Sequence, residues 1–167
     1  MFTSFSLLNS RKITPEEERE LCYLMDCFSR TSQGAFLRGI NYRNIQIYWC
    51  DNMQAAAGIM GAWLCWLGNR VYLMPNGTPP VLRMDRDPWL IQIAATFAHE
   101  LCHVYQYKRS WWLYILACLP IVRSLTIEAE ANVIFQDATK FFQTLDNLRA
   151  AQDFEKKMEK WQSESNT

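Results

Sequence analysis

Both histidines of this chain lie in one short run, His99-Glu100-Leu101-Cys102-His103. This is the H-E-x-x-H pattern. Residues four apart project from the same face of an α-helix, so the two imidazoles can bind one metal ion. Neutral imidazole is a preferred zinc ligand, and a carboxylate beside a metal-activated water molecule can act as a general base. The pattern therefore predicts a catalytic zinc site with His99 and His103 as ligands and Glu100 as the base.

A catalytic zinc site needs three protein ligands and one open position. The sequence has no further histidine, so the third ligand must be acidic or a thiolate. Glu128 and Glu130 point about 200° apart on a helix, so only one of them can face the metal. Glu128 is favoured because it shares a helix face with Asn132, which can support it by a hydrogen bond. Glu130 is the alternative and Cys118 a weaker one, and both glutamates can instead lie on a solvated helix face.

Other side chains near the motif have a structural and a functional interpretation. Gln106 follows His103 by three residues, so it can brace the metal site or be an ordinary surface amide. Cys102 lies about 100° from His103 around the helix, which favours packing over metal binding. Stabilisation of a negatively charged oxygen would need a donor that is not histidine. The candidates, which the sequence does not rank, are Tyr105, Tyr107, Tyr114 and Arg123.

Two helices have clear start signals. Thr14, Pro15 and Glu17 fit an N-cap, a first helical position and a capping box, which predicts a helix over about 14–33. Its apolar stripe consists of Leu21, Leu24, Met25 and Phe28. Pro88 begins a second predicted helix, over about 88–109, which carries the motif. Its packing stripe consists of Leu90, Ile93, Ala94, Phe97, Leu101 and Val104.

The segment between these helices predicts a small antiparallel or mixed sheet over about 44–75. Residues 45–49 form a β-prone run. The runs 62–67 and 70–74 flank Gly68-Asn69, which is typical of a hairpin with a two-residue turn. A helix that bears the two glutamates is expected from about residue 124, and the sequence leaves open whether it runs unbroken into the C-terminal helix that ends at about 162. The predicted class is α+β, with the hairpin packed on the motif helix.

Composition limits the classes of function. The chain has 167 residues, half of them hydrophobic and a fifth charged, which predicts one globular domain over 1–167. Basic and acidic residues number 17 each, so the basic excess of a nucleic-acid binder is missing and that class is excluded.

Cysteine usage and targeting signals predict a chain that is cytoplasmic as synthesised. The six cysteines form no C-x-x-C pair and are interpreted mainly as buried thiols in a reducing compartment. Residues 1–10 lack a basic segment and a cleavage site, so no signal peptide is expected. The apolar run 111–122 is too short to span a membrane. We expect it to be a buried connection or a wall of a substrate groove.

The segments FAHELCHVYQ (97–106) and IEAEAN (127–132) resemble small gluzincin-type zinc metallopeptidases. The similarity is greatest to compact H-E-x-x-H-x-x-Q domains, including those associated with contractile injection and type VI secretion effectors. It covers roughly residues 44–137. The resemblance implies a zincin-like fold with a strand pair before the motif helix. It also implies Glu128 as the third ligand, although this chain has Asn132 where many relatives carry aspartate.

The resemblance further implies a Zn²⁺-dependent peptidase acting on a peptide or protein substrate, which one arm of the hairpin could receive as an added strand. It implies a possible secretion-system or immunity partner, and export without a signal peptide. The alternative function is a zinc-stabilised interaction or delivery module with little turnover. Glu100 opposes that alternative, because a structural zinc site needs no general base. A chance motif on a helical structural protein is the remaining alternative.

Overall fold

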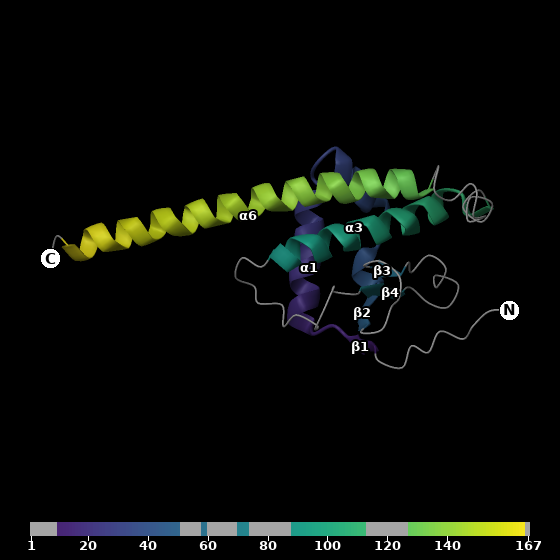
Figure 1. Ribbon diagram of the computed structural model, residues 1–167, viewed down its shortest axis with the longest axis horizontal. Helices are drawn as coiled ribbons and strands as arrows, with labels where there is room; N and C mark the ends of the chain where they lie inside the picture. The colour runs from purple at the N-terminus through teal and green to yellow at the C-terminus, as the bar shows by residue number, and fades with distance from the viewer. Residues whose placement is uncertain (1–9, 51–57, 60–69, 74–87, 113–126, 166–167) are drawn as a thin grey trace.

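The computed structural model describes residues 10–50, 58–59, 70–73, 88–112 and 127–165 (Figure 1). The α-helices are α1 (Pro15–Phe28), α3 (Pro88–Arg109) and α6 (Ile127–Ser165), with 14, 22 and 39 residues. The strands are β1 (Ser10–Lys12), β2 (Gln46–Cys50), β3 (Gly58–Ile59) and β4 (Arg70–Leu73), with 3, 5, 2 and 4 residues. The 3-10 helices η1 (Gln33–Gly39) and η2 (Tyr42–Asn44) lie between α1 and β2.

The expected α+β, zincin-like fold is wrong, because the described residues are mostly helical. The longest strand has five residues, whereas the shortest α-helix has 14. The most extensive packing joins two helices, α3 and α6, and not a helix and a sheet. In Figure 1, α3 lies between α6 and the small group of strands. The elements that position the site are therefore the two paired helices.

The start of α1 confirms the predicted capping box. The Thr14 backbone N–H donates to the Glu17 carboxylate at 2.7 Å, and the Thr14 hydroxyl accepts from the Glu17 backbone N–H at 3.2 Å. All four residues of the predicted apolar stripe are buried. The helix ends at Phe28, earlier than expected, because the chain turns back on it. A Cβ atom on Gly34 would lie 2.1 Å from the Phe28 carbonyl oxygen, so only glycine permits this turn.

The strands follow the order β1-β2-β4-β3. The β1–β2 and β3–β4 pairs are antiparallel, and the β2–β4 pair is parallel. Ile47 and Val71 lie opposite each other in the parallel pair, and both are buried. Side chains alternate between the two faces of a strand, so this pair marks the face that contributes to the core. Its neighbours in the core include Leu21, Leu37 and Phe97.

The predicted two-residue hairpin is wrong in its register. A turn at Gly68-Asn69 would place Leu64 opposite Leu73, but Gly58 lies opposite Leu73 instead. The expected first arm, 62–67, and the turn itself are outside the described residues. The second arm, β4, has partners on both sides. Because β4 is not an edge strand, a substrate strand cannot pair with it, and β-augmentation on β4 is excluded.

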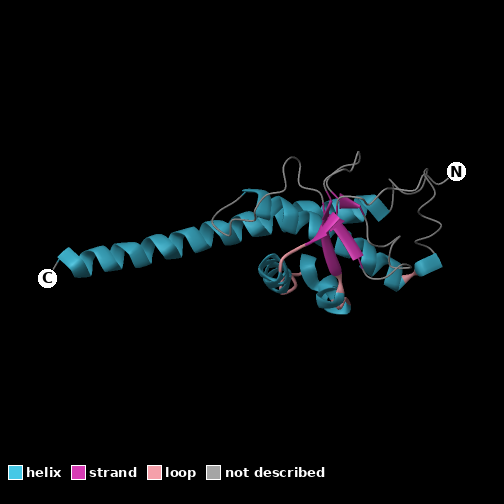
Figure 2. Ribbon diagram, turned by 90° about the horizontal axis from the view of Figure 1, so that it is seen from below, coloured by secondary structure: helices cyan, strands magenta, loops and turns pink. Residues whose placement is uncertain are grey.

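The motif helix α3 has the predicted bounds, and α6 runs antiparallel beside it (Figure 1). Five of the six predicted packing residues of α3 are buried, and Leu90 is partly buried. The sequence left open whether the C-terminal region forms one helix or two, and the structure shows one. The C-terminal part of α6 extends away from the rest of the molecule (Figure 2), and residues 151–159 are all exposed.

None of the described helices combines the length and the apolar composition needed to cross a membrane. Of the two expectations for the apolar run 111–122, the buried connection is wrong at its start, because Trp111 and Trp112 are exposed, and the wall of a substrate groove stays a prediction. The rest of that run lies outside the described residues.

Candidate metal centre

The two histidines lie one turn apart in the C-terminal half of α3. Their Nε2 atoms are 3.1 Å apart, and their rings meet edge to face. Glu128, in the first turn of α6, places Oε2 3.6 Å from the Nε2 atom of each histidine. The antiparallel packing of α3 and α6 thus brings together the three residues that the sequence singled out as ligands.

The geometry of these three atoms suits a zinc ion. Tetrahedral zinc with its usual bond lengths holds neighbouring ligand atoms about 3.4 Å apart. The distances among His99, His103 and Glu128 are 3.1 and 3.6 Å, close to that value. The side chains of His99 and Glu128 are 16% and 25% exposed, whereas that of His103 is 3% exposed. The group therefore opens to solvent on the His99 and Glu128 side, where a fourth ligand could enter.

Gln106 connects this group to α6. Its Oε1 atom lies 2.9 Å from Nδ1 of His103. Its Nε2 atom donates to the backbone carbonyl of Ile127 at 3.1 Å and to the carboxylate of Glu130 at 2.8 Å. Gln106 is therefore a bracing residue, one of the two interpretations that the sequence left open.

The alternative ligands are placed elsewhere. Glu130 is exposed and accepts a hydrogen bond from Gln106. Asn132, which the sequence suggested as support for Glu128, is exposed. Cys118 is outside the described residues. The side chain that does hold a candidate ligand in place is Gln106, one turn after His103 on α3. Its i, i+3 spacing from His103 was the only sequence signal for this contact.

The environment of the histidines differs. Burial, together with the nearby His103, lowers the pKa of His99 although Glu128 opposes the change. Burial alone would also lower the pKa of His103, but the Glu128 carboxylate, the charge of Glu100 and the hydrogen bond to Gln106 outweigh it and raise this pKa. The surroundings of His99 thus favour its neutral, metal-binding form, whereas the carboxylates near His103 favour its protonated form.

Glu100 is buried, with 3% of its surface exposed. Its charge contributes to the raised pKa of His103, so the carboxylate lies within electrostatic reach of that ligand. A carboxylate is costly to bury unless its surroundings stabilise it. A buried acid beside two histidines and a second acid is typical of a site that does chemistry.

The structure places only some of the candidate oxyanion donors. Tyr105 packs against Phe36 of η1, with ring centroids 5.8 Å apart. Tyr107 lies one turn after His103 on the same face of α3. Tyr114 and Arg123 are outside the described residues. Cys102 is buried, as the packing interpretation predicted.

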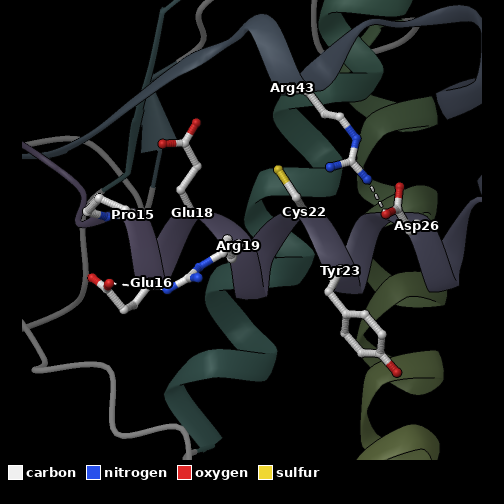
Figure 3. Close-up of a pocket in the computed structure, with 8 residues that line it drawn as sticks. All are labelled: Pro15, Glu16, Glu18, Arg19, Cys22, Tyr23, Asp26 and Arg43. Atoms are coloured by element: carbon white, nitrogen blue, oxygen red, sulfur yellow. Dashed lines mark hydrogen bonds and ion pairs between the residues drawn. The ribbon is translucent and has the colours of Figure 1, made fainter.

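A pocket of about 650 Å³ lies along α1, with Arg43 of η2 at one side (Figure 3). Two of its carboxylates are already paired with cations that line the same pocket. Arg19 lies 3.2 Å from Glu16, and Arg43 forms an ion pair with Asp26. This pocket is separate from the histidine group and contains neither histidine, so it does not compete as the metal site.

No family model, curated protein or solved structure matches this chain. The geometry of the His99, His103 and Glu128 group is therefore the main basis for a functional conclusion.

Proposed function

We propose that this chain is a zinc-dependent peptidase, with His99, His103 and Glu128 as metal ligands and Glu100 as general base. One observation carries the proposal. Glu128 comes from a different helix, yet it lies at the same distance, 3.6 Å, from both histidine nitrogens. Helical periodicity alone brings the histidines together, but only the packing of α6 on α3 can add a third ligand to them.

The residues divide the chemistry of peptide hydrolysis among them. A zinc ion held by these ligands would lower the pKa of a bound water molecule and polarise a peptide carbonyl. Glu100 would accept the proton of the attacking water and pass it to the leaving amine. His99 and Glu128, on the exposed side, would border the position where water and substrate enter.

The proposed substrate is a peptide or protein, as in the gluzincin-type peptidases that the motif segments resemble. The pattern of two histidines and one glutamate as ligands supports the similarity to these peptidases. The zincin-like fold is not part of the proposal. The competing function is a zinc-stabilised interaction or delivery module. It requires the same metal but not Glu100, so the two functions predict different results for a change at that residue.

The first test concerns Glu100. We expect Glu100→Gln to retain zinc, because Glu100 is not a ligand, and to lower kcat on a mixed peptide library by about 10²–10⁴-fold. Glu159→Gln, an exposed change on the projecting part of α6, serves as the control and should leave kcat unchanged. Cleavage by Glu100→Gln at the parent rate would refute the mechanism. A parent protein that binds zinc but cleaves nothing would support the delivery module.

The second test concerns the third ligand. We expect the parent protein to purify with one equivalent of zinc and Glu128→Ala with much less, measured by elemental analysis after gel filtration. Glu130→Ala should bind zinc more tightly than Glu128→Ala does, because Glu130 is not among the grouped ligand atoms. Full zinc content in Glu128→Ala would remove it from the ligand set.

A further inference from the structure

We propose that Gln106 is a positioning residue that fixes which nitrogen of His103 faces the metal and ties the start of α6 to α3. The inference deepens the proposed function, since it rests on the same metal site. It does not depend on whether the protein cleaves peptides.

The hydrogen bonds of Gln106 determine the tautomer of His103. A backbone carbonyl can only accept, so the amide nitrogen of Gln106 must face Ile127 and its oxygen must face His103. The amide oxygen also can only accept, so Nδ1 of His103 must carry the proton. A neutral imidazole has a single N–H, which leaves the lone pair on Nε2. That atom is the one directed at His99 and Glu128.

The amide nitrogen of Gln106 ties α6 in place. Its bond to the Ile127 carbonyl fixes the backbone directly before Glu128. Its bond to Glu130, at 2.8 Å, is charge-assisted and therefore stronger than a neutral one. Ile127 is itself buried, so this turn of α6 is held from two sides. The amide thus aligns His103 and Glu128, which come from different helices, through one side chain.

Glutamine is the side chain that meets all three demands at this position. It offers one acceptor to the ring of His103 and two donors to α6. Glutamate would keep the acceptor but lose both donors, and its charge would oppose Glu130. Alanine would lose every bond. Changes at position 106 can therefore separate the two roles of the side chain.

Zinc affinity, measured by competition with a chelator, tests the positioning role. We expect Gln106→Ala and Gln106→Glu each to bind zinc about 10–100-fold more weakly than the parent, as for other residues that orient metal ligands. Gln152→Ala, an exposed change on the projecting part of α6, is the matched control and should bind as the parent does. Affinities within about threefold of the parent for both Gln106 variants would overturn the proposal.

A reciprocal exchange tests the tie to α6. Combining Gln106→Glu with Glu130→Gln restores a donor and an acceptor between the two positions with their polarity reversed. We expect this double variant to recover part of the affinity that Gln106→Glu loses. A double variant that binds zinc no better than Gln106→Glu alone would refute the tie.

The tautomer can be read without any metal. The chain has only two histidines, so ¹⁵N-histidine labelling gives two rings, which His99→Gln assigns. At a pH where both rings are neutral, we expect His103 to be protonated at Nδ1 in the parent and to lose that preference in Gln106→Ala. Protonation of His103 at Nε2 in the parent would refute the inference. A parent without zinc affinity would refute the proposed function and leave this spectrum to decide on Gln106.

Discussion

His99 and His103 are one turn apart on the same helix, but they differ in exposure and in their hydrogen bonds. His99 is partly exposed and borders the open side of the group, whereas His103 is almost fully buried and held by Gln106. In the proposed metal site, the buried histidine would set the orientation of the ligand group. The partly exposed one lies where water and substrate would enter. A change at His103 should therefore disturb the group more than the same change at His99.

Cys102 yields a prediction at the residue scale. Burial, with a smaller contribution from the charge of Glu130, raises the pKa of this thiol from 9.0 to about 12. The thiolate is the reactive form, so we expect alkylation of Cys102 by iodoacetamide at pH 8 to be much slower in the folded than in the urea-unfolded protein. Mass spectrometry of the peptide that contains Cys102 measures both rates. Equal rates would show that the thiol is accessible and ionises normally.

The same shift affects stability at high pH. The unfolded chain ionises this thiol near pH 9, whereas the folded chain keeps it protonated to about pH 12. The contribution of this buried thiol to the free energy of unfolding is therefore fully present below about pH 9 and is lost as the pH rises toward 12. We expect Cys102→Ala to show a shallower fall in the free energy of unfolding over that range. An equally steep fall would mean that Cys102 does not contribute.

At the scale of elements, the sequence predicted the helices, which depend on local signals, better than it predicted which strands pair. The capping box at Thr14 and the bounds of α3 depend on neighbours in the sequence, and both are confirmed. The partners of β4 depend on residues far along the chain, and the favourable Gly-Asn turn indicated the wrong register. Helical periodicity could separate Glu128 from Glu130. It could not identify the backbone carbonyl of Ile127 as a partner of Gln106.

The capping box gives a prediction for α1. We expect Thr14→Ala to lower the free energy of unfolding by about 1 kcal/mol, because it leaves the Glu17 backbone N–H without its hydroxyl acceptor. Thr14→Ser keeps that acceptor and is the control. Urea denaturation measures both. A loss in Thr14→Ser as large as that in Thr14→Ala would indicate that the methyl group matters and not the cap.

At the scale of the whole molecule, α6 has two parts with different surroundings. Its first half packs on α3 and on α1, where Phe142 contacts Phe28 and Arg149 pairs with Glu20 at 3.1 Å. Beyond Arg149 the helix continues into solvent, and Phe154 is 64% exposed. A helix of 39 residues is about 58 Å long, so it is longer than the segment that packs on α3 and α1.

This division predicts the effect of a truncation. We expect removal of residues 151–167 to change Tm by less than about 2 °C and to leave zinc affinity unchanged, because residues 151–159 are exposed throughout. Phe142→Ala, within the packed half, should instead lower the free energy of unfolding by about 3–5 kcal/mol. Thermal unfolding and chelator competition measure both effects. A large drop in Tm on truncation would show that the projecting half stabilises the fold.

The antiparallel arrangement of α3 and α6 also makes the proposed metal centre a cross-link between two parts of the chain that are distant in sequence. Gln106 and Ile127 are 21 positions apart in the sequence, and the proposed metal ligands lie on the two helices that flank the same segment. For an idealised flexible chain, the entropic cost of joining two ends grows only with the logarithm of the number of residues between them, so doubling that number would cost about 0.6 kcal/mol. Insertions between the helices should therefore weaken zinc binding by only about threefold. The number of residues between the two helices could therefore change with little effect on the proposed metal site.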